Sequence, residues 1–412
     1  MNDSQPMVGI DVGSATAAVV VARPDGDQLQ VLGCGQARHD GSRKGIVANL
    51  QEVSEAIRMA AEEAEAMAAV PVERAVVGIG GTPILGVRST ASVPITGRDH
   101  TVTDEDQQRA LEACAQVSIP PDYRVLDIIP SEFALDGQAG VDHPVGLPGV
   151  RLDATAFVLY TPRTHADMVE QAVNRAAVAV RQLVYEPLAA AEAVLTTDER
   201  DLGCLVIDIG YATTEWALIL EHAMIASGAV PIGGRHFTSD LATVLNTTTA
   251  SAEQLKRDLG ANRQREGLED EAVEIPTLGG DGNQVHAARF AVDVLHERAR
   301  ELLIAINQQV MAEGLERAPR SGLVLTGGGA RLDGLEELAE VIFGRRARLG
   351  TPRQLTGIVE PVSGPEWAVA CGLIRLQHRR DTRVVMSFKP RNGILGWLRN
   401  ALGELFEMGG GM

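Results

Sequence analysis

The chain has 412 residues, of which 45% are hydrophobic and 22% charged, and its formal net charge is -18. This composition is typical of a folded α/β protein and argues against a disordered chain and against a nucleic-acid partner. No apolar stretch approaches the roughly 20 residues of a membrane-spanning helix, and the first residues do not resemble a secretory signal. The four cysteines are far apart, which predicts buried thiols in a reducing cytoplasm.

The first predicted element occurs twice. Residues 8–21 read VGIDVGSATAAVVV and residues 205–218 read LVIDIGYATTEWAL, so both contain Ile-Asp, an apolar residue, Gly, a variable residue and Ala-Thr. Apolar runs on both sides of each glycine predict a β-hairpin, and the repeat predicts two similar lobes. Each first strand ends at an aspartate, and the turn after it contains Gly13 or Gly210, which can adopt dihedral angles closed to other residues.

Two such turns facing each other predict a polyphosphate site. Backbone N–H groups around the turns can point at an anion, and Asp11 and Asp208 could hold a hydrated Mg²⁺. For a single copy, an incidental Asp-x-Gly turn is an equally good interpretation. The second copy and a later glycine-rich turn favour the phosphate site.

Further motifs follow along the chain. A helix is predicted in 184–195, with Glu186 at its start, and another after Gly233 and Gly234, with Thr238 or Ser239 as its cap. Glu253 and Lys256 share one helical face, and taken alone this spacing favours a solvated surface pair over a binding site. Gly327, Gly328 and Gly329 lie between an apolar strand and a predicted helix, whose N-terminus would favour phosphate.

The order of these motifs resembles the actin/heat-shock-chaperone/sugar-kinase ATPase superfamily. Within it, the chain is similar along nearly its whole length to the FtsA family of bacterial cell-division proteins. The segments that carry the similarity are RVLDIIPSEFALDGQAGVDHPVGLPGVRL (124–152), TTDERDLGCLVIDIG (196–210) and LTGGGARLDGL (325–335).

The resemblance implies an α/β, two-lobed actin-like fold with an inserted subdomain, 1C, and a C-terminal amphipathic helix. In the first lobe, subdomain 1A is expected at 7–85 and 164–200, with 1C inserted at 86–163. In the second lobe, subdomain 2A is expected at 201–233 and 320–376, with 2B at 234–319. A basic linker is expected at 377–391 and the amphipathic helix at 392–408.

The resemblance also implies that ATP and Mg²⁺ bind between the hairpins. Asp11 and Asp208 would hold the Mg²⁺ through water, with Glu186 as a further candidate. The first phosphate loop would be Gly13, Ser14 and Ala15, the second Gly210, Tyr211, Ala212 and Thr213, with Gly233 and Gly234 nearby. Glu253 and Lys256 would hold the nucleoside, and Gly327, Gly328 and Gly329 its adenosine side. No catalytic residue is assigned, because Asp11, the one candidate base, already has the Mg²⁺ role, and at most weak ATPase activity is expected.

Three positions depart from the family pattern. Tyr211 and Ala212 replace two glycines. If either position requires a positive φ, the non-glycine residue there has a conformational cost of about 1–2 kcal/mol. The Tyr211 side chain could also crowd the γ-phosphate. Thr16 stands where the first loop often has lysine. Subdomain 2B, which in the family receives the C-terminal peptide of FtsZ, has Gln284 and Ala288 where basic residues are common. Its candidates for an acidic peptide are Arg289, Arg298 and Arg300, and the alternative for them is intrahelical pairing with Glu297 and Glu301.

The last segment predicts a membrane-binding helix. Plotted at 100° per residue, one half of the helix circle carries the residues Ile394, Leu395, Trp397, Leu398, Ala401, Leu402, Leu405 and Phe406. Between Arg375 and Arg391 there are six basic residues and one acid, which suits an anionic cytoplasmic leaflet. The alternative is a helix docked on the protein's own core.

The expected function is that of an adaptor that binds ATP, polymerises with itself, ties the FtsZ ring to the cell membrane and recruits later divisome membrane proteins. The alternatives are a phosphotransferase or phosphatase such as a sugar kinase, a chaperone ATPase, and the pilus-assembly relative of FtsA. The last of these lacks the C-terminal amphipathic segment.

Overall fold

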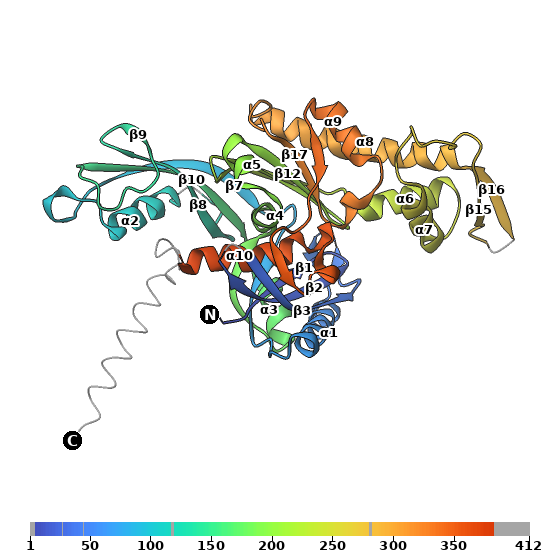
Figure 1. Cartoon of the computed structure of the whole chain (residues 1–412), viewed down its shortest axis with the longest axis horizontal. Helices are drawn as coiled ribbons and strands as arrows, with labels where there is room; N and C mark the ends of the chain where they lie inside the picture. Colours follow the sequence, from blue (N-terminus) through green and yellow to red (C-terminus); the bar gives the residue numbers. More distant parts are fainter. Residues whose placement is uncertain (1–4, 27, 44, 117–118, 280–281, 383–412) are drawn as a thin grey trace, which may run out of the picture.

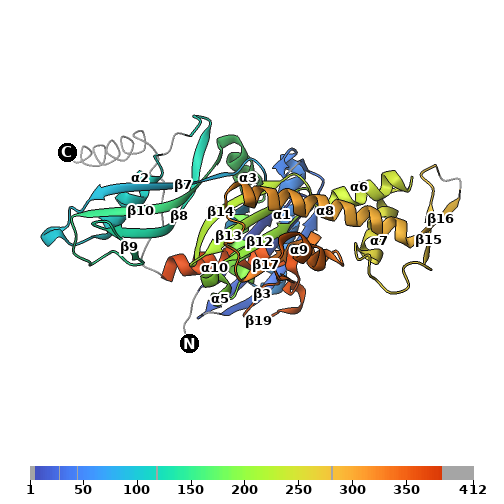
Figure 2. The ribbon, with the colours of Figure 1, turned by 90° about the horizontal axis from the view of Figure 1, so that it is seen from above.

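The structure, a computed structural model, describes residues 5–26, 28–43, 45–116, 119–279 and 282–382. Two lobes, each built on a β-sheet, occupy the centre, and a smaller subdomain extends from each side (Figures 1 and 2). Within these ranges, none of the helices has the length and hydropathy of a membrane span.

The first lobe contains a six-stranded sheet in the order β11-β6-β1-β2-β3-β19. Its strands are β1 Met7–Val12, β2 Thr16–Asp25, β3 Gln28–Arg38, β6 Arg74–Ile79, β11 Ala179–Tyr185 and β19 Leu355–Gly357. Its helices are α1 Leu50–Ala68, α3 Arg163–Arg175, α4 Glu186–Val194 and α10 Ala368–Thr382, and the short strands β4 Ser42–Arg43 and β5 Ile46–Val47 pair with each other.

Helices pack closely on both faces of this sheet because glycines face them. A Cβ at Gly35 would lie 2.1 Å from the carbonyl oxygen of Ala60 on α1, and a Cβ at Gly9 would lie 2.3 Å from that of Ala370 on α10. In Figure 1, α1 and α3 lie below the sheet and α10 above it. The largest hydrophobic core fills the space between these layers.

The second lobe contains a five-stranded sheet in the order β14-β13-β12-β17-β18. Its strands are β12 Cys204–Ile209, β13 Thr214–Leu220, β14 Ala223–Val230, β17 Gly322–Thr326 and β18 Ala347–Leu349. Its helices are α5 Thr197–Leu202, α8 Ala288–Ala312 and α9 Leu335–Phe343, with the 3-10 turns η2 Gly328–Arg331, η3 Glu360–Val362 and η4 Pro365–Trp367. The buried indole N–H of Trp216 donates to Gln309 Oε1 on α8 at 2.7 Å, which joins sheet and helix.

Both predicted hairpins are confirmed. Strands β1 and β2 pair antiparallel with Asp11 opposite Ala18, and β12 and β13 pair antiparallel with Asp208 opposite Glu215. The predicted helix after Tyr185 is also present as α4, which contacts α10 in its own lobe and β12 and β13 in the other. The two hairpins and α4 therefore meet where the lobes adjoin.

The inserted subdomain has its own sheet in the order β7-β10-β8-β9. Its elements are β7 Leu85–Pro94, η1 Arg98–His100, α2 Asp104–Cys114, β8 Tyr123–Leu135, β9 Gln138–Val141 and β10 Arg151–Pro162. The capping box between Thr103 and Asp106 starts α2, which packs on this sheet over a separate core. The subdomain projects at the left of Figure 1.

The opposite end of the molecule is formed by α6 Gly234–Val244, α7 Thr249–Leu259, the first turns of α8 and the hairpin of β15 Ala272–Pro276 and β16 Asn283–Ala287 (Figure 2). The predicted cap of α6 at Thr238 or Ser239 is wrong. The helix begins at Gly234, because the backbone N–H of Gly233 finds an acceptor in His236 Nδ1 at 3.0 Å.

Helix α10 continues to Thr382, so residues 377–382 are helical and do not belong to a linker. Three of the six basic residues expected there lie on this helix. Arg379 pairs with Glu192, and Arg380 pairs with the buried Asp127 at the start of β8. These charges therefore already engage carboxylates of the folded protein, which weakens the electrostatic part of the membrane argument.

Candidate functional site

A cleft of about 1870 Å³ lies between the two lobes and is lined by most residues of the expected nucleotide site. Those that line it are Asp11, Gly13, Ser14, Ala15, Glu186, Asp208, Gly210, Tyr211, Thr213, Gly234, Glu253, Lys256, Gly327, Gly328 and Gly329. Of the remaining two, Ala212 is buried and Gly233 precedes α6 as its N-cap. The fold thus brings together motifs that are more than three hundred residues apart in the sequence.

The turns of the two hairpins have ordinary dihedral angles. Neither Gly13 nor Gly210 has a positive φ, which contradicts the expected reason for glycine at these positions. A Cβ at either glycine would lie 3.0 Å from a carbonyl oxygen, that of Thr16 or of Thr213. The glycines therefore serve tight backbone packing within the turn.

Tyr211 and Ala212 carry no positive φ either. The expected strain of about 1–2 kcal/mol per residue is therefore wrong for this chain. The backbone of the loop is instead held to α6, because the N–H of Gly234 donates to Gly210 O and the N–H of Arg235 donates to Tyr211 O, both at 2.9 Å. The Tyr211 side chain is 46% exposed and borders the cleft, so crowding of a phosphate there stays a prediction.

The carboxyl groups of Asp11, Glu186, Asp208 and Glu215 line the cleft, two from each lobe. Burial and the neighbouring Asp208 raise the pKa of Asp11 to about 7, and burial raises the pKa of Asp208 itself to about 6. Burial and repulsion from Asp208 and Asp11 raise the pKa of Glu215 to about 8, and the pKa of Glu186 is raised well above its usual range by burial and by the other three carboxyl groups. Ionising all four groups together is therefore costly without a bound cation.

Glu215 is a candidate site residue that the sequence interpretation missed. It lies on β13 directly opposite Asp208, is 5% exposed, and accepts a hydrogen bond from the backbone N–H of Gly81 through Oε1. Its other oxygen, Oε2, is buried without a partner. The available signal was an acidic residue inside the apolar strand TEWALIL, where a charge is costly unless something pairs with it.

The carboxylates fit a magnesium ion. All are hard oxygen donors, and the unpartnered Glu215 Oε2 leaves an acceptor for a cation or its water. In the part of the chain that the structure describes, no three acidic, histidine or cysteine side chains are grouped so that they could ligate one ion. The arrangement therefore suits an ion that arrives with phosphates and keeps several waters.

Glu253 and Lys256, the residues expected to hold the nucleoside, belong to a polar cluster at the cleft. Lys256 Nζ lies 2.7 Å from Glu253 Oε2 and donates to Thr238 Oγ1 at 3.0 Å and to Gly234 O at 3.2 Å, while the Thr238 hydroxyl donates to Glu253. The lysine side chain is only 14% exposed. This burial argues against a simple solvated surface pair.

The glycine-rich loop packs against the second hairpin. Gly327 has φ +81°, and a Cβ there would lie 2.2 Å from Asp208 Oδ1. A Cβ at Gly329 would lie 2.5 Å from a methyl carbon of Ile209. The loop does not lead directly into an α-helix, because the turn η2 intervenes and α9 begins at Leu335, so the expected helix N-terminus is not at these glycines.

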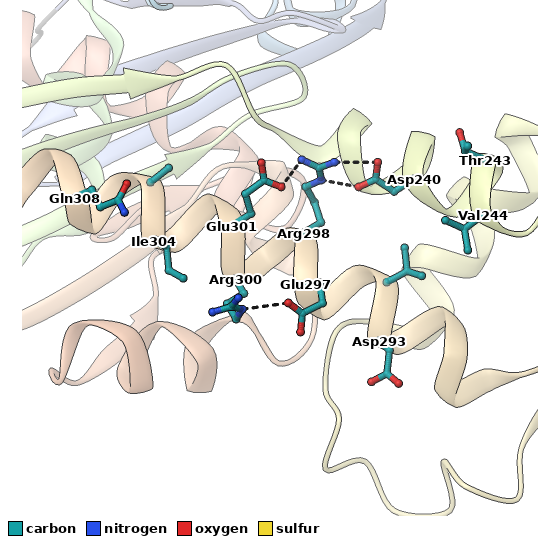
Figure 3. A pocket seen from close by; sticks show the side chains of 12 residues that line it. Asp240, Thr243, Val244, Asp293, Glu297, Arg298, Arg300, Glu301, Ile304 and Gln308 are labelled. Atoms are coloured by element: carbon teal, nitrogen blue, oxygen red, sulfur yellow. Dashed lines mark hydrogen bonds and ion pairs between the residues drawn. The ribbon is translucent and has the colours of Figure 1, made fainter.

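The three arginines expected to bind a partner peptide all form ion pairs within the protein. Arg289 pairs with Glu269 and Asp293, Arg298 with Asp240 and Glu301, and Arg300 with Glu297 at 3.1 Å. Arg298 and Arg300, but not Arg289, line a groove of about 820 Å³ between α6 and α8 (Figure 3). The intrahelical pairs foreseen as the alternative are thus present.

The expected membrane residues, Ile394, Leu395, Trp397, Leu398, Leu402, Leu405 and Phe406, lie outside the described residues. The prediction made for them stays open.

Two family models match the chain. One, described as "Cell division protein FtsA", matches residues 205–372, and the other, described as "SHS2 domain inserted in FTSA", matches residues 81–160. The cell division protein FtsA of Pseudomonas aeruginosa is 33% identical over 91% of this chain and 90% of its own length. That of Escherichia coli is 32% identical over 90% of both chains.

Solved structures with the same fold are more distant in sequence. A chain of the PilM-PilN type IV pilus biogenesis complex has a TM-score of 0.65 at 18% identity, over 90% of this chain and 98% of that one. MreB5 of Spiroplasma citri bound to ADP has a TM-score of 0.54 at 13% identity, over 93% and 99%. These likenesses show the actin-like fold, whereas the sequence relatives show the family. The chain belongs to the FtsA family of cell division proteins.

Proposed function

We propose that the chain binds ATP with Mg²⁺ in the cleft between its lobes and acts as an adaptor in cell division. The observation that carries the proposal is that two Asp-containing hairpins, one from each lobe, line the same cleft together with Glu186 and Glu215. The nucleotides named for the MreB5 structures, ADP and AMPPNP, support binding of an adenine nucleotide on this fold.

In this proposal the backbone of each hairpin turn cradles the phosphates. Ser14 and Thr213 border the cleft at the two turns and offer N–H and hydroxyl donors without a lysine. Bound Mg²⁺ would neutralise phosphate and carboxylate charge, with Asp11 and Asp208 accepting hydrogen bonds from its waters. The cluster of Glu253, Lys256 and Thr238 would hold the nucleoside.

Hydrolysis is at most slow in this proposal. Backbone strain no longer supports that view, because Tyr211 and Ala212 are unstrained. The structure also adds Glu186 and Glu215 to Asp11 as groups that could accept a proton from water. The remaining reason is the Tyr211 side chain at the cleft, and a Tyr211→Gly variant that releases phosphate faster would support it.

The groove between α6 and α8 is the proposed site for the C-terminal peptide of FtsZ. Val244, Val294, Ile304 and Ala305 supply apolar surface, and the charged rim holds four acidic groups and two arginines. Because Arg298 and Arg300 are already paired, a purely acidic peptide gains less from them than the sequence implied. A peptide with apolar anchors and charges of both signs fits this groove better.

Peptide binding can be tested by charge reversal. Arg298→Glu with Arg300→Glu should weaken the binding of the FtsZ C-terminal peptide by about tenfold in fluorescence anisotropy. The matched control is Arg346→Glu, a side chain that is 92% exposed and lies outside the groove. Unchanged affinity in the double variant would exclude these two arginines, and an equal loss in the control would indicate a non-specific charge effect.

The remaining parts of the proposal follow the family. The protein would polymerise with itself, contact later divisome membrane proteins, and lie at the cytoplasmic face of the cell membrane as a peripheral protein through residues 392–408. Firm membrane binding would require a filament that presents many such helices at once.

Nucleotide binding is tested by calorimetry and phosphate release together. The full chain should bind ATP in the presence of Mg²⁺ and release phosphate slowly. Asp208→Ala should lose most of the binding, since it removes one carboxylate from the centre of the site. Binding that survives this change would refute the site, and rapid turnover would refute the adaptor.

A further inference from the structure

The inserted subdomain joins the first lobe next to the carboxyl cluster. Residues 80–84 connect β6, which lies between β11 and β1 in the sheet of the first lobe, to β7, the first strand of the insertion. The chain returns through β10 directly into α3. Both connections therefore pass beside the proposed metal site, where Gly80, Gly81 and His165 line the cleft.

Gly80 and Gly81 are held by hydrogen bonds from the second lobe and from α3. The N–H of Gly81 donates to Glu215 Oε1 on the second lobe, and His165 Nε2 on α3 donates to Gly80 O at 2.9 Å. A Cβ at Gly80 would lie 2.2 Å from Glu186 Oε2 and 2.6 Å from Glu215 Oε1, so both carboxyl groups press against this backbone. Gly81 has φ +99°, which a residue with a side chain rarely adopts.

The two carboxylate oxygens of Glu215 have different surroundings. Oε1 binds the segment that leads to the insertion, and Oε2 is buried among Asp11, Asp208 and Glu186 without a partner. Without a cation, the neighbouring carboxyl groups disfavour the charged form of Glu215 at this position. A cation near Oε2 would offset the repulsion and hold Oε1 on Gly81.

We infer that Glu215 is a positioning residue that couples Mg²⁺ and nucleotide in the cleft to the segment leading into the inserted subdomain. The inference rests on the proposed function. It makes nucleotide binding and the order of residues 80–85 mutually dependent, since a contact that favours one state of the segment must also favour nucleotide binding to that state. A purely structural Glu215 would hold Gly81 equally well with or without nucleotide.

Amide hydrogen exchange of the full chain tests this, with calorimetry on the same samples. Mg²⁺ with ATP should slow exchange in peptides covering residues 80–94 by about fivefold, and ATP with EDTA should slow it by less than about twofold. Glu215→Gln keeps an oxygen that can accept from Gly81 but loses the charge that faces the cation. It should therefore retain protection without nucleotide and lose the response to Mg²⁺.

Two further variants keep the test independent of folding defects. Glu215→Asp keeps the charge but shortens the side chain by one carbon, so it should lose the response in residues 80–94 even at ATP concentrations that calorimetry shows to saturate the variant. Glu192→Gln removes a carboxylate that is equally buried, at 5% exposure, but lies outside the cleft, and it should respond as the wild type does.

The outcomes distinguish a failure of this inference from a failure of the proposed function. If wild-type protein binds ATP but residues 80–94 do not change, or if both Glu215 variants keep the full response, the inference is overturned while the proposed function stands. If wild-type protein binds no ATP, the proposed function fails and the inference fails with it.

Discussion

Replacing Gly327 with alanine would place a methyl group on a carboxylate of the proposed metal site. The glycine has φ +81° and ψ +164°, a region that is essentially closed to other residues and costs about 1–3 kcal/mol. The added Cβ would also lie 2.2 Å from Asp208 Oδ1 and 2.7 Å from Ile209 O, and neither contact can persist at that distance. Either the loop or Asp208 must move.

The expected result is a loss of both stability and nucleotide binding. If the cost of about 1–3 kcal/mol falls on the geometry that binds nucleotide, the Kd for ATP with Mg²⁺ rises about 5- to 150-fold. Gly328→Ala is a close control, because its φ is not positive and the nearest atom to its Cβ would be 3.8 Å away, on Glu366.

Calorimetric titration of ATP, with thermal melts of the same samples, measures both effects. Gly328→Ala should bind within about twofold of wild type. Equal affinity in Gly327→Ala and wild type would refute the idea that this loop and Asp208 act together at the nucleotide. Equal losses in both variants would show that the loop simply tolerates no side chain.

Three further predictions concern pH, helix packing and the C-terminal segment. In the metal-free protein the pKa values of Asp11, Asp208 and Glu215 lie above their ordinary values of 3.8, 3.8 and 4.5, so the folded state retains protons that the unfolded chain has released. Its thermal stability should therefore fall as the pH rises from about 4 to 8, and Mg²⁺ with ATP should oppose the fall; a rise over that range would contradict the burial of these groups. Gly372→Ala should lower the free energy of unfolding in urea by about 1–3 kcal/mol or more, because its Cβ would lie 1.8 Å from Ala189 O and force α4 and α10 apart; an unchanged midpoint would contradict this contact. Full-length protein should sediment with anionic vesicles, whereas Trp397→Glu and a chain truncated after Ser387 should remain in the supernatant; sedimentation of the truncated chain would exclude the tail as the anchor.

The parts of the fold that were predictable are those with a local signal. The hairpins follow from apolar runs around Asp11 and Asp208, and α4 follows from a glutamate and a proline at its start. Their meeting at one cleft could be expected only through the family resemblance, since a repeat does not say how two lobes face each other.

The parts that were missed depend on contacts between distant residues. The role of Glu215 rests on its register opposite Asp208 and on the N–H of Gly81 from the other lobe. The extension of α10 rests on Arg379 and Arg380, which find their acidic partners on α4 and β8. The start of α6 rests on the ring of His236, a cap that the preference for serine and threonine at this position does not reveal.

The surface arginines of α8 also make contacts with distant residues that the sequence does not reveal. Their spacing to Glu297 and Glu301 predicted the intrahelical pairs, but not the contact of Arg298 with Asp240 on α6. That contact, drawn in Figure 3, links α8 to α6 and makes these charges less free for a partner than their sequence suggests.

The most direct test of the account is a crystal structure of the full chain with Mg²⁺ and a non-hydrolysable ATP analogue. The account predicts the phosphates between the turns at residues 13–15 and 210–213, a hydrated cation facing Asp11, Asp208 and Glu215, and the nucleoside beside Lys256. A nucleotide bound elsewhere, or a cation that contacts none of these carboxylates, would contradict it.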